Sequence, residues 1–385
     1  MEIKKMRNKI LAVAGACVLS AAANADGRNI YTISNSPDGN VVAVVKRDDH
    51  GGLKLKGTYP TGGVGTGVGL VIPPDPLGTQ NALVLSDDQR WLFVPSAASN
   101  QISVFRVYED TLVLASVTPS GGDYPAGIAV RGNVVYVLHA TNKPSVTGFR
   151  LTGNGRLIPI PGSKRTLSTV TASAGPQPDV LDSPGQIQFS PDGRWLVATD
   201  KNVTLAQPGT IELFAVGKDG RLGTAAVTTV STDPAPFGFT FDARGHLLVT
   251  EAINGALSNY QINRDGTLTS LSRVVSGQQT VCWIDSRGRY AYTSNTLSDS
   301  LSAYRVDDNG TLTILNPDGV AVAIGAGALP IEVKISGDGK YLYAVAAGLG
   351  TIESYRINSR TGGLTKAGEL HLYPGLSGMS SLAVE

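Results

Sequence analysis

The sequence predicts an all-β fold, a seven-bladed β-propeller with four-stranded antiparallel blades. Two short strand-forming units recur along the chain, and a partial copy at the N-terminus is complemented by one leftover strand at the C-terminus. Only 16% of the 385 residues are charged, and 46 are glycine. This composition favours short strands and tight turns over helices.

The first recurring unit is an apolar residue, a polar turn that mostly contains glycine, and a β-rich run. Each copy is typical of two strands joined by a hairpin turn. The copies occupy residues 85–94, 189–197, 241–249, 284–292 and 335–343, with a shortened copy at 130–137.

The second unit follows each copy of the first and alternates apolar and polar residues around an aromatic or aliphatic centre. It occupies residues 102–107, 146–151, 211–216, 257–262, 301–306 and 352–357. Most copies then continue into a polar glycine turn and a leucine, which predicts an outer hairpin. The two units together predict four antiparallel strands over roughly 45–60 residues, the spacing of propeller blades.

The two ends of the chain predict how the ring closes. Six complete units begin near residues 81, 126, 184, 236, 280 and 330, while residues 29–56 supply three strands without an innermost one. The terminal segment 380–385 matches an innermost strand without outer partners. Together they predict a seventh blade whose closure leaves no exposed sheet edge. An open β-solenoid has no need of such matching fragments.

The first 25 residues predict a secretory signal peptide. A basic start with Lys4, Lys5 and Arg7 precedes a short apolar stretch over residues 10–23, and small residues follow at positions 23 and 25. This order is typical of a cleaved export signal. We therefore expect a mature propeller domain over residues 26–385, in the periplasm or secreted, with no membrane span.

The charge balance limits the expected partners. Removal of the signal takes away four of the 32 basic residues and one of the 31 acidic ones, which leaves a mature chain of net charge −2. Such a chain has no basic footprint for nucleic acid. Cys282 is its only remaining cysteine, so no internal disulfide is expected, and its apolar setting favours a core position. We expect a monomer that takes a small molecule, such as a lactone or a sugar-like ligand.

The repeats resemble those of the lactonase-like propellers, which include the 6-phosphogluconolactonases and the carboxymuconate cycloisomerases. The resemblance rests on the turn at residues 190–194, the outer strands of the second unit, and the following turns such as 219–222. It spans nearly all of the mature chain and implies the propeller fold. It further implies a hydrolase acting on a carboxylic ester, since the family includes lactonases.

Antiparallel connectivity brings the ends of the second strands and the starts of the innermost strands to one face of the ring. We expect polar side chains from these positions to surround the channel mouth. The candidate ligand-binding residues are Asn35, Asn81, Gln186 and Asn295. Two long insertions, Pro60 to Gln80 and Arg165 to Pro184, open onto the same face and are candidates for a lid.

The resemblance implies catalytic positions that this sequence keeps only in part. The family's acidic residue aligns with Glu251, which is retained. Its histidine aligns with Gly185, its Arg-His pair with Phe237 and Gly238, and its further cation with residues 277–279, so these groups are absent. Without them, a phosphorylated or carboxylate-rich substrate is not expected.

Three residues from consecutive blades form a substitute catalytic set. His139 is the candidate general base that activates water, and Asp200 and Glu251 are candidates for the orienting or acidic group. Alternatively Asp200, Glu251 and Asn295 offer oxygen ligands suited to calcium. Otherwise no cofactor is expected.

Two functions remain open from the sequence. The first is an exported lactone hydrolase with Glu251, His139 and Asp200 around the substrate. The second is a non-catalytic exported propeller that binds a ligand or a protein, which the absent family residues favour.

Overall fold

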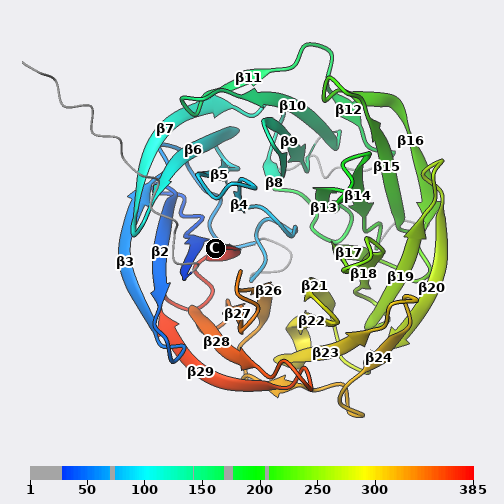
Figure 1. Ribbon diagram of the computed structural model, residues 1–385. Helices are drawn as coiled ribbons and strands as arrows, with labels where there is room; N and C mark the ends of the chain where they lie inside the picture. Colours follow the sequence, from blue (N-terminus) through cyan, green and yellow to red (C-terminus); the bar gives the residue numbers. More distant parts are fainter. Residues whose placement is uncertain (1–27, 70–73, 142, 169–176, 204–207) are drawn as a thin grey trace, which may run out of the picture.

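The computed structural model describes residues 28–69, 74–141, 143–168, 177–203 and 208–385. The predicted signal peptide and its cleavage site lie outside these ranges. Seven antiparallel sheets stand around a central channel as the blades of a propeller (Figure 1). The predicted fold class is confirmed.

Each blade runs from an innermost strand at the channel to an outermost strand at the rim. The strands are, blade by blade, β30 (Ser380–Val384), β1 (Asn29–Ile33), β2 (Val41–Arg47) and β3 (Leu53–Pro60); β4 (Val84–Leu85), β5 (Trp91–Ser96), β6 (Gln101–Tyr108) and β7 (Thr111–Pro119); β8 (Pro125–Arg131), β9 (Val134–His139), β10 (Ser145–Leu151), β11 (Leu157–Pro159) and β12 (Arg165–Thr166); β13 (Pro184–Phe189), β14 (Trp195–Asp200), β15 (Thr210–Val216) and β16 (Leu222–Val230); β17 (Pro236–Phe241), β18 (Leu247–Glu251), β19 (Ala256–Ile262) and β20 (Leu268–Val275); β21 (Val281–Arg287), β22 (Tyr290–Asn295), β23 (Ser300–Val306), β24 (Leu312–Ile314) and β25 (Val322–Ala323); β26 (Pro330–Ile335), β27 (Tyr341–Ala346), β28 (Thr351–Ile357) and β29 (Leu364–His371).

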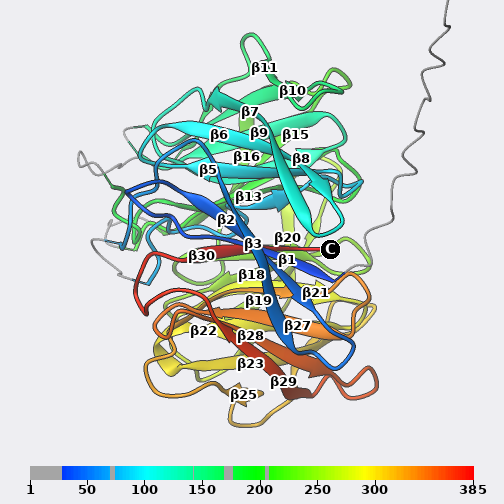
Figure 2. The ribbon, with the colours of Figure 1, turned by 90° about the vertical axis from the view of Figure 1, so that its left-hand side faces the viewer.

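The ring closes through its own C-terminal strand, as the terminal fragments predict. The N-terminal sheet has the strand order β3-β2-β1-β30, with Ile30 opposite Val384 and Tyr31 opposite Ala383. Figure 2 shows β30 beside β1 although the two lie at opposite ends of the sequence. The Tyr31 hydroxyl also donates a hydrogen bond of 2.5 Å to the side chain of Glu385.

A shared side-chain motif explains why the first sequence unit forms a hairpin. The hydroxyl of Ser86 accepts a hydrogen bond from the Trp91 backbone N–H and donates one to Asp88, whose carboxylate also accepts the Arg90 N–H. The repeat thus satisfies the polar groups of a tight turn within five residues. The same bonds recur after Phe189 and Ile335 in their blades.

The hydrophobic core lies between neighbouring blades rather than within any one sheet. Val197 and Leu213 of one blade pack in one cluster with Phe239 and Val249 of the next. The outermost strands instead alternate between half-buried and exposed residues, as β20 does. A propeller blade therefore buries both faces of its inner strands and only one face of its rim strand.

Two details differ from the sequence predictions. Arg165 and Thr166 were expected in a loop, yet they form β12 and pair with β10. The Arg165 guanidinium donates to the carbonyls of Leu222 and Gly223 in the next blade, which holds this segment at the rim. The innermost strand expected from residue 81 is reduced to β4, because the preceding residues cross the channel.

Among the described residues the one helix is η1 (Thr296–Ser298), and none is long and apolar enough to cross a membrane.

The closing strand offers a direct test of ring stability. Leu382 on β30 is inaccessible to solvent, so Leu382→Ala is expected to lower the free energy of unfolding by about 2–5 kcal/mol in chemical denaturation. Leu55→Ala on β3, where the side chain is 40% exposed, is the control and should shift it by less than about 0.5 kcal/mol. Equal losses in both variants would contradict a dominant role for the closing strand.

Candidate functional site

The second strands of the six complete blades end at the residues that the sequence indicates. These terminal residues are Ser96, His139, Asp200, Glu251, Asn295 and Ala346. Five of them pair with the first residue of the innermost strand in their own sheet, as Glu251 does with Pro236, whereas Ser96 lies beyond the short strand β4. This face of the ring therefore gathers the positions from which a site was predicted.

A cavity of about 380 Å³ opens on this face. Both long insertions contribute to its wall, and so do innermost strands and the turns after second strands. The lining residues are Pro74, Asp75, Val180, Leu181, Lys201, Val203, Ala235, Phe237, Ala252, Ile253, Thr280, Cys282, Trp283, Thr296, Leu297, Leu329 and Leu376. An apolar pocket with a few polar groups is the usual form of a small-molecule site.

Lys201 is the cation of this cavity. It follows β14 directly and is almost fully buried. Its Nζ donates to the Gly78 carbonyl at 2.6 Å, and to the Ser183 hydroxyl and the Pro184 carbonyl at 3.3 Å each. The ammonium also lies 4.6 Å from the ring centre of Phe237. Lys201 thus ties the two insertions together while it borders the cavity.

Asp75 is the carboxyl that accompanies Lys201. Burial raises the pKa of Asp75 to about 6, while the charge of Lys201 and the Gly78 N–H, 2.9 Å from Oδ1, act in the opposite direction. Burial likewise lowers the pKa of Lys201 to about 8, and the Asp75 carboxylate limits that fall. Burial also raises the pKa of the neighbouring Cys282 thiol, which keeps it protonated. The cavity therefore holds an acid and a base that both titrate near neutrality.

Neither His139 nor Glu251 lines the cavity, and each forms hydrogen bonds with residues outside the cavity wall. A ring nitrogen of His139 lies 3.0 Å from the Ser120 carbonyl, and burial lowers the pKa of the imidazole to about 4. The Glu251 carboxylate accepts from Ser231 at 2.9 Å and from Tyr260 at 3.0 Å, and burial raises its pKa to about 7. Their catalytic roles stay predictions.

Asp200 is buried at the end of β14. Its negative charge favours the ammonium form of Lys201. The Asn295 amide donates to Ser300 and Ser302, both at 2.9 Å and both in its own blade. Among the described residues no group of three or more His, Cys, Asp or Glu side chains is placed to hold a metal ion. Because the proposed calcium set of Asp200, Glu251 and Asn295 includes an amide, this finding does not test it, and the calcium site stays a prediction.

Asn35 and Gln186 hold backbone segments in place. The Asn35 amide donates to the Gly67 carbonyl at 3.0 Å and so anchors the first insertion. Gln186 accepts from the Phe239 N–H at 2.7 Å and donates to the Phe239 carbonyl at 2.9 Å, which joins the innermost strands of two blades. Both side chains therefore have structural partners, and neither lines the cavity.

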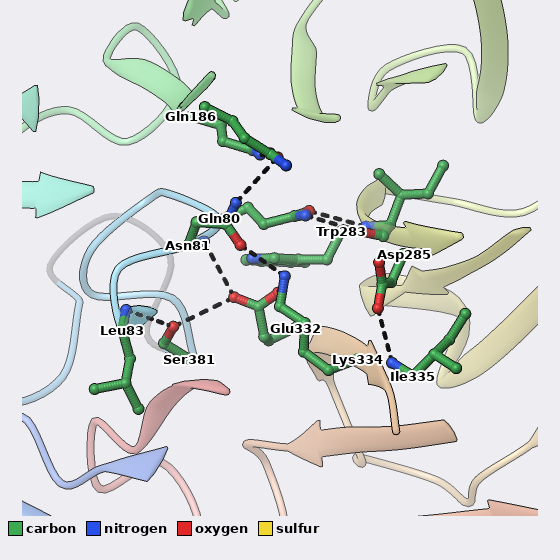
Figure 3. Close-up of polar contacts among 12 residues, drawn as sticks. Gln80, Asn81, Leu83, Gln186, Trp283, Asp285, Glu332, Lys334, Ile335 and Ser381 are labelled. Carbon is green, nitrogen blue, oxygen red and sulfur yellow. Dashed lines mark hydrogen bonds and ion pairs between the residues drawn. The ribbon is translucent and has the colours of Figure 1, made fainter. Parts of the chain in front are cut away.

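Gln80 carries the end of the first insertion across the channel. Its backbone N–H donates to the Gly185 carbonyl at 2.9 Å. Its side-chain amide accepts from the Ile284 N–H at 2.9 Å and donates to the Ile284 carbonyl at 2.8 Å, on the opposite side of the channel (Figure 3). Gln80 also lines a second cavity, of about 280 Å³, and does not line the apolar one.

Asn81 belongs to a polar cluster in the channel below Gln80 (Figure 3). Lys334 donates to its Oδ1 at 2.6 Å and lies 3.6 Å from the Glu332 carboxylate. Glu332 accepts from the Asn81 N–H and the Ser381 hydroxyl, each at 3.4 Å. Asn81, Glu332 and Ser381 all have positive φ, near 60°. Strained backbone of this kind persists only where the surroundings hold it firmly.

Neither Asp75 nor Lys201, the two charged residues among the described residues of the cavity wall, is predicted from the sequence. Asp75 lies inside an insertion whose path no repeat defines. Lys201 follows the predicted Asp200 by one residue, and a cation at the end of a buried strand was the available signal. Lys201 does not align with any of the family's cationic positions, so the resemblance gives no indication of it.

Comparison with known proteins supports the resemblance seen in the repeats. Residues 282–376 match the family model described as lactonase, 7-bladed beta-propeller. This part of the chain is thus similar to the lactonase propellers, and the whole described chain has the seven-bladed β-propeller fold. A 6-phosphogluconolactonase of Yersinia pseudotuberculosis is 24% identical over 222 residues, a match that spans 56% of this chain and 62% of that relative.

Solved structures share the propeller fold of this chain over most of its length. The periplasmic gluconolactonase of Pseudomonas aeruginosa has a TM-score of 0.71 at 18% identity, covering 93% of this chain and 98% of that one. A protein of Bacteroides uniformis described as a candidate 6-phosphogluconolactonase also reaches 0.71, at 20% identity, covering 93% of this chain and 100% of that one.

The bridging amide of Gln80 is expected to stabilise the channel. Gln80→Leu leaves the Ile284 N–H and carbonyl without this partner in a buried position, so the free energy of unfolding should fall by about 1–3 kcal/mol in chemical denaturation. Gln261→Leu, on the exposed face of β19, should change it little. A similar loss in both variants would show that the bridge adds nothing.

Glu332 is expected to make stability fall with rising pH. Burial raises its folded pKa from 4.5 to about 7, so its favourable contribution is complete below pH 4.5 and is lost as the pH rises to about 7. The glutamine of the Glu332→Gln variant cannot ionise. As the pH rises through this window, the free energy of unfolding of the variant should therefore increase relative to that of the parent, by at most roughly 3 kcal/mol at pH 8. Denaturation series at several pH values measure the difference, and a constant difference would contradict the assignment.

Proposed function

We propose that the protein hydrolyses a lactone in the cavity formed by the two insertions. The observation that carries the proposal is the pair Asp75 and Lys201, buried together in an apolar cavity on the face where the resemblance places the family's catalytic groups. Phe237, which aligns with the family's arginine, lies in the same wall. The names of the family model and of the relatives support the same class of reaction.

Asp75 and Lys201 divide the chemistry between them. The Asp75 carboxylate takes a proton from water as the water oxygen bonds to the lactone carbonyl carbon. The Lys201 ammonium stabilises the negative charge that develops on the carbonyl oxygen, an effect that a water-poor cavity strengthens. When the ring C–O bond breaks, the protonated Asp75 returns its proton to the departing ring oxygen. No step in this scheme needs a metal.

The residues predicted from the sequence take supporting positions in this scheme. Asp200 adds to the effect of Asp75 in favouring the charged form of Lys201, against the larger effect of burial. Glu251 precedes two lining residues, Ala252 and Ile253, and its raised pKa makes it the alternative base. His139, neutral at physiological pH, is the further candidate for a general base.

We also propose that the protein acts outside the cytoplasm as a monomer. The predicted signal over residues 1–25 supports export, and a structural neighbour is described as periplasmic. The net charge of the mature chain gives no reason to expect nucleic acid as a partner.

One observation favours a non-catalytic ligand-binding propeller instead. Gly78, Ser183 and Pro184 offer acceptors for all three hydrogens of the Lys201 ammonium. If these bonds persist with ligand bound, Lys201 only fastens the insertions and the cavity retains its ligand without turnover.

The pH profile of hydrolysis separates the two functions. Asp75 must be ionised and Lys201 protonated, so kcat/KM should rise near pH 6 and fall near pH 8. Asp75→Asn should lower kcat by about 10²–10⁴-fold and remove the acidic limb. Steady-state assays across this pH range on a panel of δ-lactones measure both effects.

Two further variants make the result decisive. Asp318→Asn, on an exposed turn, controls for loss of a carboxylate and should leave the profile unchanged. If Glu251→Gln removes the acidic limb and Asp75→Asn does not, the base is Glu251. Ligand binding without turnover of any lactone would establish the binding propeller.

A further inference from the structure

We propose that the natural substrate is a lactone with a hydrocarbon substituent, rather than a sugar lactone. This inference rests on the proposed function and concerns the same cavity. The lactone ring lies against Asp75 and Lys201, and the hydrocarbon chain runs along the apolar wall towards the exposed turns after β18 and β22.

The first argument is the lack of hydrogen-bonding groups for a hydroxylated ring. Besides Asp75 and Lys201, the polar side-chain groups of the described wall residues are the hydroxyls of Thr280 and Thr296, the thiol of Cys282 and the indole of Trp283. Thr296 donates to a backbone carbonyl at 3.0 Å, Thr280 accepts a backbone N–H at 3.2 Å, and the indole donates to a backbone carbonyl at 3.4 Å. A sugar hydroxyl buried here loses water without an equivalent partner, which is unfavourable.

The second argument is a set of large apolar side chains that line the cavity and also reach solvent. Ile253 is 54% exposed, Leu297 61% and Leu376 41%, although all three belong to the cavity wall. Exposed apolar groups that gather at the mouth of a pocket mark a binding surface. We name these three residues the apolar rim.

The third argument is the position of the charged pair relative to this rim. Lys201 and Asp75 come from the end of β14 and the first insertion, while Ile253 and Leu297 come from the turns that follow β18 and β22, in the next two blades. The cavity thus has a polar part and an apolar part. A molecule with a polar ring and an apolar chain matches both.

The test is a series of δ-lactones that carry no substituent, or an ethyl, butyl or hexyl chain, with gluconolactone for comparison. Burial of each added methylene should raise kcat/KM by about fourfold until the chain extends past the rim. Ile253→Ser and Leu297→Ser should flatten this dependence, so the loss of kcat/KM that they cause should grow with the length of the chain. Leu349→Ser is the matched control, because Leu349 is 39% exposed in the corresponding turn after β27 and does not line the cavity.

Binding of the matching alkyl lactams separates this inference from the proposed function. These analogues keep the ring and the carbonyl but resist hydrolysis. Calorimetry should show affinity that grows with chain length and a negative heat-capacity change. If the lactams bind in this way and no lactone is hydrolysed, the hydrocarbon specificity stands and the hydrolase proposal fails.

Two results would overturn the inference. One is hydrolysis of gluconolactone that equals or exceeds that of the hexyl lactone. The other is a chain-length dependence that the Ile253 and Leu297 variants leave intact, because the hydrocarbon would then lie elsewhere.

Discussion

The innermost strand of each blade has one edge that faces the channel, and no further strand covers it. Neighbouring blades satisfy this edge with side chains. Gln186 pairs with the Phe239 backbone, Asp285 accepts the Ile335 N–H, and Ser381 accepts the Leu83 N–H. These bonds fix the blades at the channel, as the apolar clusters fix them farther out. The face that carries the cavity depends on this arrangement for its shape.

The first insertion is also held by side chains that hydrogen-bond to the backbone of other segments. Gln80 reaches the Ile284 backbone, and the insertion that it ends is anchored by Asn35 and Lys201. The loop is therefore part of the propeller wall rather than an appendage. This explains how a chain that lacks several of the family's charged positions still presents a buried carboxyl and a buried cation on the same face, supplied from outside the family motif.

The sequence predicts the ring because the repeat contains the side chains that each hairpin turn requires. The turn around Ser86 and Asp88 recurs with the same side-chain bonds in two further blades, so the pattern is visible without a structure. The predicted ends of the second strands, including His139 and Glu251, follow from the same periodicity. Asp75 could not be found in this way, because its position depends on the path of an insertion. Periodicity also does not tell which way the side chain at a strand end points. The sequence therefore could not show that Glu251 lies beside the cavity and outside its wall.

The pairing of β30 with β1 also has a consequence for the order of folding. The strands that complete the N-terminal blade are separated by almost the whole chain, so β1 presents an open edge until the last residues have emerged. Contacts of such long range form slowly, and open strand edges recruit other chains. The period before closure is therefore when this propeller is most exposed to aggregation.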